Sequence, residues 1–321
     1  MINIKPVFIH KHNIPVIPAI DKDLISEELS PDKLVKKTNS GNNEIYIISA
    51  HNSPQVMREI GRLREISFRD SGGGTGKELD IDEHDTADHP FLQIIVWNPR
   101  EKDIIGGYRY IRGKEMLTDN NGRPITPTAE LFDFSGKFIN EYLPYSIEFG
   151  RSFVQPMYQP GYNLRKGMFS LDNLWDGIGY MLNQNPDIKY LYGKMTMYPH
   201  YNKKARNLIL CFLKKFFADS DGLMSPKKNL DISPKSMRHA KVFKAATYEE
   251  NYKILLQEVR KHNETVPPLF NAYMNLSATL ICGGTAMNHH FGEVEETAII
   301  LTVGDIYEIK KDRYFSANQK S

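Results

Sequence analysis

The chain has 321 residues, of which 40% are hydrophobic and 25% charged, an ordinary composition for one large globular domain or two smaller ones. Its two cysteines, Cys211 and Cys282, have no paired or metal-ligand spacing, so we expect reduced thiols in a cytoplasmic protein. The first residues have no apolar signal segment and no stretch approaches 18 apolar residues, so neither secretion nor a membrane span is expected.

Charge is unevenly distributed along the chain. The net charge is only +2, but residues 201–244 hold 11 Lys or Arg against 3 Asp, so the other residues sum to −6. A local excess of this size indicates contact with an acidic partner. Nucleic acid is not the expected partner, because these lysines alternate with the apolar face of a helix.

Elements can be predicted in chain order from the first residue. Residues 1–43 are polar and rich in proline, which indicates an arm with one short helix. A strand is expected at 44–49 and a helix at 53–68, with Ser53 as its N-cap and Pro54 in its first turn. A polar loop then leads to the next strands.

The remaining pattern alternates strands and helices irregularly. Two apolar runs flank the turn-rich "NPREKD" and predict an antiparallel hairpin. The other expected elements are strands at 145–155, 188–197 and 297–309, helices at 170–184, 203–217 and 249–262, and a short helix leading into a strand at 267–284. This order favours an α/β fold with a mixed sheet over a doubly wound one.

Two polar loops resemble ligand sites. "SGGGTGKE" (71–78) resembles a phosphate loop, but Ser71 stands at the first glycine and Glu78 follows the lysine. "DIDEHDTADH" (80–89) offers oxygen and nitrogen ligands but no zinc-type spacing, so no metal is expected. Its candidate ligands would be Asp82, His84, Asp85, Asp88 and His89.

Charged residues stand inside two otherwise apolar strands. Glu148 and Arg151 are three apart, so in a regular strand they point to opposite faces, unless the chain bends at Gly150. Arg109 has the parity of neighbouring isoleucines and is expected on an apolar face. A buried guanidinium needs a carboxylate, which the Asp82 loop or Glu148 can supply, and a purely structural ion pair is the alternative to a functional role.

The order of these residues resembles the acyl-homoserine-lactone synthases and related carrier-protein-dependent N-acyltransferases that begin ornithine- and glycine-lipid synthesis. Their pattern is Arg and Phe four apart on a helix, an acidic loop, Ile-Gly-x-x-Arg on a strand and Glu-x-x-Arg on the next. Its matching positions are Arg64, Phe68, Asp80, Asp82, Asp85, Arg109, Glu148 and Arg151. Asp80 replaces the Glu of the lactone synthases.

The resemblance covers residues 45–315. "GRSFVQPMYQ", "LDNLWDGIGY" and "PPLFNAYMNLSATLICGG" look like the glycine N-acyltransferases of Bacteroidota, a group whose members are often labelled hemolysin-like. One departure is Asn288, where related chains often carry Asp.

The resemblance implies a GNAT N-acyltransferase fold, with a mixed, mostly antiparallel sheet, a bulged central strand and a C-terminal α/β extension. The division expected is an arm (1–43), an acyltransferase core (44–220) and an extension packed on that core (221–321). A bulge at Gly150 would put Glu148 and Arg151 on one face and bare a backbone N–H.

The reaction implied is transfer of a long fatty acyl group to the α-amine of a small amino acid, glycine first and ornithine second, as the first step of amino-acid lipid synthesis. Glu148 is the expected general base, and the backbone at Gly150 is expected to stabilise the oxyanion. Arg64 or Arg109 would hold the substrate carboxylate. The full substrate-binding set comprises Arg64, Phe68, Asp82, Asp85, Arg109 and Arg151.

The acyl donor implied is a phosphopantetheine thioester on acyl carrier protein or coenzyme A, with no tightly bound cofactor. Four residues form the expected donor loop: Gly161, Arg165, Lys166 and Gly167. Three form the expected carrier-docking surface: Lys203, Lys204 and Arg206. The acyl tail would contact Phe149, Phe153, Met168, Phe169, Leu171 and Trp175, unless these are plain core.

We expect the protein in the cytoplasm, with a peripheral contact to the inner face of the inner membrane. Two alternatives remain from sequence. One is an acetyl-coenzyme A-dependent N-acetyltransferase, and the other is a non-catalytic module that binds acyl carrier protein or lipid.

Overall fold

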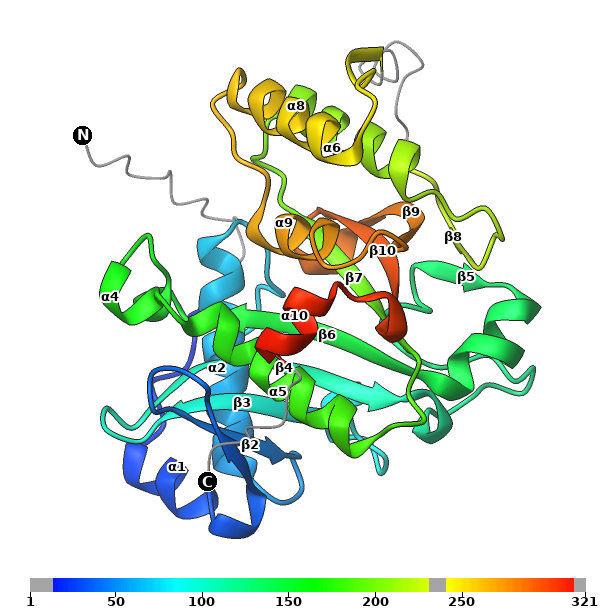
Figure 1. Ribbon diagram of the computed structural model, residues 1–321. Coiled ribbons are helices and arrows are strands. Elements are labelled where there is room, and N and C mark those ends of the chain that lie inside the picture. The colour runs from blue at the N-terminus through cyan, green and yellow to red at the C-terminus, as the bar shows by residue number, and fades with distance from the viewer. Residues whose placement is uncertain (1–13, 231–240, 315–321) are drawn as a thin grey trace.

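An eight-stranded sheet runs through the protein in this computed structural model, which describes residues 14–230 and 241–314 (Figure 1). The first 13 residues of the expected arm and residues 231–240 of the basic segment lie outside the described residues. The strand order is β1-β2-β3-β4-β6-β7-β10-β9, and only β6 and β7 pair in parallel. The expected mixed, mostly antiparallel sheet is therefore confirmed.

The strands of this sheet are β1 (Leu34–Lys37), β2 (Glu44–Ile48), β3 (Leu92–Asn98), β4 (Asp103–Arg112), β6 (Ser146–Val154), β7 (Tyr190–Met197), β9 (Ile281–Asn288) and β10 (Val294–Thr302). A separate two-stranded sheet pairs β5 (Phe132–Phe134) with β8 (Met224–Pro226). The helices are α1 (Lys22–Glu28), α2 (Pro54–Asp70), α3 (Glu83–Thr86), α4 (Leu164–Gly167), α5 (Ser170–Gln184), α6 (Lys203–Phe216), α8 (Tyr248–Arg260), α9 (Pro268–Met274) and α10 (Glu308–Tyr314).

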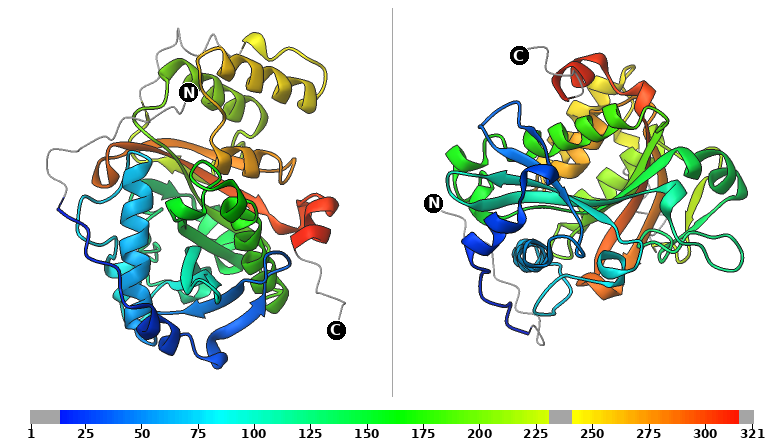
Figure 2. Two further views of the ribbon diagram at one scale, coloured as in Figure 1. Left: turned by 90° about the vertical axis from the view of Figure 1, so that its left-hand side faces the viewer. Right: turned by 90° about the horizontal axis from the view of Figure 1, so that it is seen from below.

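Helices cover both faces of the sheet: α2 lies on one face and α5 on the other (Figure 2). The alternation of side chains along a strand divides the core accordingly. Ile94 of β3 packs in the cluster that contains α5, while its neighbour Ile95 packs in the cluster that contains α2. No helix in the described ranges is long and apolar enough to cross a bilayer.

The beginning of α2 differs from the prediction. Ser53 precedes the helix and Pro54 opens it, but the Ser53 side chain caps no backbone N–H of the helix. Instead the Glu28 carboxylate at the end of α1 accepts hydrogen bonds from the N–H groups of Gln55 (3.0 Å) and Val56 (2.9 Å). A carboxylate also suits the positive end of the helix dipole, so the N-terminal arm supplies the cap from a distance.

The three predicted segments contribute to one sheet. Strand β1 from the expected arm pairs with β2, and β10 from the expected extension pairs with β7 along its whole length. The predicted boundaries at residues 43 and 220 therefore do not separate one sheet from another.

Strand β4 carries a bulge that alters the predicted facing of Arg109. Val96 pairs with Gly106 and Trp97 with Ile104, which leaves Ile105 as an extra residue in β4. Ile105 consequently packs in the α5 cluster with Tyr108. Arg109, next to Tyr108, points to the opposite face of the sheet, which α2 covers. The prediction that Arg109 lies on the same face as Ile105 is therefore wrong, whereas its predicted burial is confirmed.

Candidate functional site

Strand β6 bulges one residue later than predicted. Gly150 pairs with Arg109 and Phe153 with Gly107, so Arg151 and Ser152 together oppose the single residue between those partners. Arg151, not the glycine, has the left-handed backbone conformation, with φ of 50°. This conformation costs a non-glycine residue about 1–2 kcal/mol, so other contacts must hold Arg151 in place.

The bulge reverses the alternation of β6. Phe149 packs in the α5 cluster, whereas Phe153, four residues on, packs in the α2 cluster. Glu148 and Arg151, three apart, therefore line the same pocket. The predicted shared face is confirmed, and only the position of the bulge is corrected.

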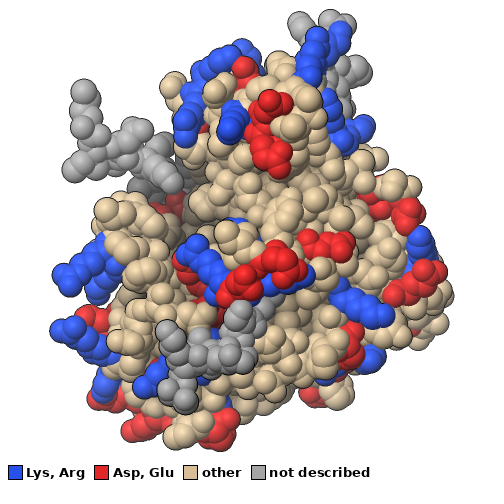
Figure 3. Space-filling view, in the orientation of Figure 1, with Lys and Arg blue, Asp and Glu red and all other residues tan. Residues whose placement is uncertain are grey.

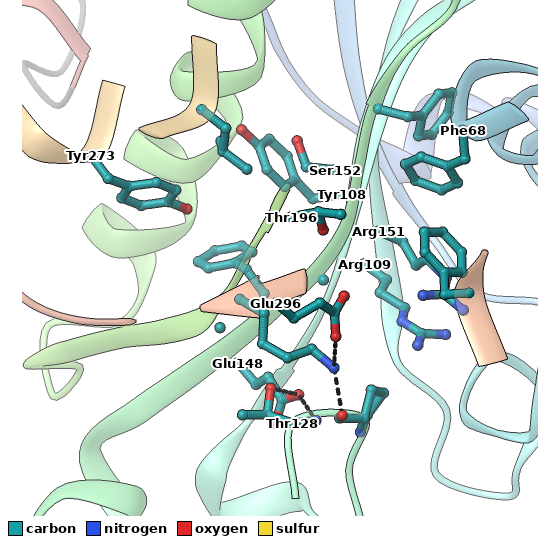
Figure 4. A pocket seen from close by; sticks show the side chains of 18 of the residues that line it. Phe68, Tyr108, Arg109, Thr128, Glu148, Arg151, Ser152, Thr196, Tyr273 and Glu296 are labelled. Atoms are coloured by element: carbon teal, nitrogen blue, oxygen red, sulfur yellow. Dashed lines mark hydrogen bonds and ion pairs between the residues drawn. The ribbon is translucent and has the colours of Figure 1, made fainter. Parts of the chain in front are cut away.

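A cavity of about 240 Å³ opens where β6 and β7 part (Figure 4). The parallel pairing of these strands ends at Phe149 and Gly193. Gly193 is required there, because a Cβ on it would lie 2.4 Å from the Phe149 carbonyl oxygen. Beyond this point the edge of β6 that faces β7 has no strand partner, so its backbone groups border the cavity.

Glu148 lines this cavity, and one of its two carboxylate oxygens accepts no hydrogen bond from the described residues. Its Oε1 accepts hydrogen bonds from the Thr128 backbone N–H (3.1 Å) and hydroxyl (2.7 Å). Its Oε2 is buried and has no hydrogen-bond partner among the described residues. The side chain of Tyr192 lies close, and burial together with the charge of Glu148 raises the pKa of Tyr192 well above its ordinary value.

Three arginines and three aspartates form a buried network beside Glu148. They are Arg64, Arg109, Arg151, Asp80, Asp82 and Asp85. Arg109 Nη1 lies 2.6 Å from Asp82 and 3.2 Å from Asp85, which confirms that the acidic loop supplies its partner. The loop is itself fixed, because Asp82 and Asp85 form a capping box at the start of α3.

Burial and ion pairing act in opposite directions on the pKa values of this network. Burial would lower the pKa of Arg109, but Asp85 and Asp82 raise it above its ordinary value. Burial would raise the pKa of Asp82, but Arg109 holds it below its ordinary value. For Asp80 burial prevails over its arginine neighbours and raises the pKa.

Arg64 does not line the cavity. Its side chain is fully buried, with Nη1 on Asp85 (3.1 Å) and Nη2 on Gln93 (2.5 Å). The expectation that Arg64 holds a substrate carboxylate does not fit this position behind the acidic loop. Gln93, which also donates to Asp85 (3.0 Å), was missed from sequence because a single polar residue in a strand gives no further signal.

Arg109 and Arg151 do line the cavity. Arg151 binds Asp80 through Nε (2.9 Å) and stacks on the Phe291 ring, with 4.2 Å between Cζ and the ring centroid. These contacts offset the cost of its backbone conformation. Phe68 packs edge-on against the same Phe291 ring (5.0 Å between centroids) and also faces the cavity, as expected for a substrate-binding residue.

A second ion pair in the cavity was not predicted. Lys194 of β7 lies 3.0 Å from Glu296 of β10 and donates to the Pro127 carbonyl oxygen (2.6 Å). Asn288 donates to Glu296 (3.2 Å), a hydrogen bond that an ionised Asp could not donate. Lys194 stands in an apolar strand much as Arg109 does, and this signal could have identified it.

Two tyrosines, one buried and one partly buried, also line the cavity. Tyr108 lies beside Ser152, and burial raises its pKa to about 12. Burial likewise raises the pKa of Tyr198 to about 12. Both phenols therefore keep their protons at neutral pH and can donate them.

The residues of the predicted donor loop lie outside the cavity lining. Arg165 and Lys166 are on α4, and Lys166 pairs with Glu101 (3.4 Å). A Cβ on Gly167 would lie 2.5 Å from the Pro160 nitrogen, so tight packing of the loop requires this glycine. Gly161 is exposed, with open space where a Cβ would project.

The predicted carrier-docking residues divide into two kinds. Lys203 and Lys204 are exposed at the start of α6. Arg206 is largely buried and lies 3.4 Å from Glu295, so it does not fit an exposed docking role.

The residues predicted to contact an acyl tail also divide. Phe149, Phe153 and Leu171 line the cavity. Trp175 is plain core, packed between Tyr273 and Tyr314. The remaining two, Met168 and Phe169, are exposed to solvent, by 58% and 39%.

One group of metal-ligand type occurs among residues 14–230 and 241–314. It comprises Glu83, His84 and Glu130, whose ligand atoms lie within 4.8 Å of one another. Asp82 and Asp85, which were considered as ligands from sequence, are instead engaged by arginines.

The splayed strands, the bulge and the carboxylate between them define an N-acyltransferase of the GNAT class. Residues 63–166 match the family model described as acetyltransferase (GNAT) domain. This confirms the fold class inferred from the resemblance, and the chain is an enzyme of that type.

Two relatives indicate which family of GNAT N-acyltransferases the chain belongs to. The chain is 49% identical over 302 residues to a glycine N(alpha)-acyltransferase of Phocaeicola vulgatus, covering 94% of this chain and 93% of the relative. It is also 49% identical to a glycine N(alpha)-acyltransferase of Bacteroides thetaiotaomicron, over 93% and 89% of the two chains. The chain belongs to this family of Bacteroidota N-acyltransferases. No solved structure matches it.

Proposed function

We propose that this protein transfers a long fatty acyl group from acyl carrier protein to the α-amine of glycine. The observation that carries the proposal is Glu148, a buried carboxylate that lines the cavity between the splayed strands and whose Oε2 accepts no hydrogen bond within the described residues. The names of both relatives favour glycine as the acceptor, with ornithine as the second candidate. The product, an N-acyl amino acid, would be the first intermediate of an amino-acid lipid.

Glu148 acts as the general base in this proposal. The ammonium group of the acceptor binds Oε2 and gives up a proton to it, directly or through one water. The free amine then attacks the thioester carbonyl carbon, and a C–N bond forms as the C–S bond breaks. A backbone N–H on the unpaired edge of β6 from Gly150 onward stabilises the oxyanion, which is typically worth about 3 kcal/mol. Tyr108 or Tyr198 protonates the leaving thiolate, and its phenolate regains a proton from the attacking nitrogen, which becomes the amide N–H.

The substrate carboxylate is assigned to Arg109 and Arg151. Both guanidinium groups line the same cavity as Glu148, and Arg109 Nε has no hydrogen-bond partner among the described residues. Asp82 and Asp85 hold Arg109 in position, Asp80 holds Arg151, and Arg64 contacts Asp85 from the side away from the cavity. Phe68 closes the wall beside Arg151.

Donor recognition is proposed to use two regions. Gly161, Arg165, Lys166 and Gly167 approach the phosphopantetheine phosphate, while the exposed pair Lys203 and Lys204 contacts the acidic carrier protein.

Reversing the charge of Lys203 and Lys204 is expected to raise the KM for acyl carrier protein but not for acyl-pantetheine, with the defect shrinking at high salt. Reversal at Lys253, an exposed lysine of α8, is the matched control. Equal losses with both donors would assign Lys203 and Lys204 to the active-site scaffold instead.

The experiment that tests the function is a competition. The purified chain is incubated with long-chain acyl carrier protein, acetyl-coenzyme A and a mixture of amino acids, and the products are identified by mass. N-acylglycine with a long chain is expected. N-acylornithine would change the acceptor, and N-acetyl products alone would replace the proposal with the acetyltransferase alternative. No transfer at all would leave the non-catalytic alternative.

A further inference from the structure

The segment between β6 and α5 exposes an unusual number of large apolar side chains. Met157, Tyr162, Leu164, Met168 and Phe169 are exposed by 56%, 58%, 71%, 58% and 39%. They are five of the thirteen exposed large hydrophobic residues in the described part of the chain, yet they fall within 13 consecutive positions. Clustering of this kind marks an interaction surface, because single exposed apolar residues are common but gathered ones are not.

The segment itself carries only basic charges, although Lys166 pairs with Glu101 and the Tyr162 hydroxyl donates to Asp70 from neighbouring segments. No Asp or Glu occurs between Glu148 and Asp172, whereas Arg165 and Lys166 stand among the exposed apolar residues. Figure 3 shows the projection that carries α4 as mainly neutral surface with basic side chains at its outer edge. Aromatic, Met and Leu side chains beside Lys and Arg are typical of a surface that enters the headgroup region of an anionic bilayer.

The segment joins two residues that line the cavity, although none of its own residues does. Val154, where β6 ends, and Leu171, in the first turn of α5, both line the cavity, and the exposed segment joins them. The cavity of about 240 Å³ is smaller than the roughly 300–1,000 Å³ of ordinary small-molecule sites, so a long acyl chain would extend beyond it. An apolar surface at this rim gives such a chain a path out of water.

We propose that residues 157–169, here called the rim segment, bind the surface of a bilayer that contains anionic lipid, and that Arg165 and Lys166 contact lipid phosphates when no donor phosphopantetheine occupies them. The inference rests on the proposed long-chain product, which has one fatty tail and a carboxylate and so partitions into a bilayer. Acyl carrier protein fits the rim segment less well as its main partner. Only two cations stand among five large apolar side chains, whereas recognition of an acidic carrier depends on charge.

The test is vesicle flotation of the full chain. Vesicles of phosphatidylcholine with added phosphatidylglycerol are expected to bind the protein, and high salt should weaken but not abolish this binding. The double variant Met157→Asp, Leu164→Asp should bind at least about tenfold less, because two apolar anchors are lost. Ile309→Asp on α10, which changes a side chain exposed by 76%, is the matched control and should bind like the parent.

Transfer of a short acyl group from acyl-pantetheine to glycine is measured on the same preparations. This activity should be unchanged in the double variant, since neither residue lines the cavity. Unchanged vesicle binding by the double variant, or no binding by the parent, would overturn the inference. So would a double variant that loses only acyl carrier protein binding, which would reassign the rim segment to the carrier. Absence of N-acylglycine despite vesicle binding would instead contradict the proposed function alone.

Discussion

Replacing Glu148 with Gln removes the proposed proton acceptor and leaves the shape of the side chain unchanged. The amide oxygen can still accept both hydrogen bonds from Thr128, and the new NH₂ takes the place of the buried Oε2, close to the Tyr192 side chain. The free energy of unfolding should therefore change by no more than about 1 kcal/mol. Loss of a general base typically costs 10²–10⁴-fold in rate, or about 3–5 kcal/mol of activation free energy.

The assay compares kcat and kcat/KM for glycine by following thiol release, with urea unfolding measured on the same samples. Thr128→Val is the matched control, because it removes the hydroxyl donor to Oε1 but keeps the backbone N–H and the carboxylate. We expect Thr128→Val to lose about tenfold or less, consistent with one charge-assisted hydrogen bond. Near-parental kcat in a folded Glu148→Gln variant would refute the base assignment.

Three further predictions concern the scaffold. Arg109→Lys should destabilise the protein by about 1–3 kcal/mol and lower kcat/KM, because one ammonium cannot reproduce the hydrogen bonds of the guanidinium. Loss of stability alone, with normal kcat in the folded fraction, would show that Arg109 is purely structural. Gly193→Ala should destabilise the protein by about 1–3 kcal/mol, because the new Cβ would lie 2.4 Å from the Phe149 carbonyl oxygen. Gly150→Ala should fold normally, because the atoms nearest to its Cβ would lie at 3.5 and 3.7 Å. Equal urea midpoints for the two variants would contradict the strand geometry. The pKa of Asp82 is lower in the folded state, so Asp82 contributes stability above about pH 4 that is lost as the pH falls. The thermal midpoint of Asp82→Asn should therefore decline less from pH 6 to pH 3 than that of the parent. Parallel declines would show that Asp82 makes no such contribution.

Charged residues inside apolar strands made part of this site predictable. Arg109 and Glu148 each interrupt a strand pattern, and the cost of burying an unpaired charge requires a nearby partner for each. The acidic loop leads into β3, the expected hairpin partner of β4, and Asp82 and Asp85 do hold Arg109. Such an argument succeeds because a predicted hairpin brings the start of one strand close to the end of the other.

Contacts between distant segments could not be predicted in the same way. The bulge at Ile105 depends on how β4 pairs with β3, and it reversed the facing that simple alternation assigned to Arg109. The ion pair of Lys194 and Glu296 depends on β10 lying beside β7, about a hundred residues apart in the chain. The cap of α2 by Glu28 likewise depends on where the arm folds back. Each of these is decided by tertiary packing and leaves no local signal.

The central claim is that the cavity beside Glu148 joins a long acyl chain to glycine. It is tested most directly by supplying a hexadecanoyl carrier protein with glycine as the sole acceptor and measuring thiol release and product mass together. One N-hexadecanoylglycine is expected for each thiol released, and Glu148→Gln should reduce both in parallel. Thiol release without N-acylglycine, or a product that forms equally fast in the Gln variant, would contradict it.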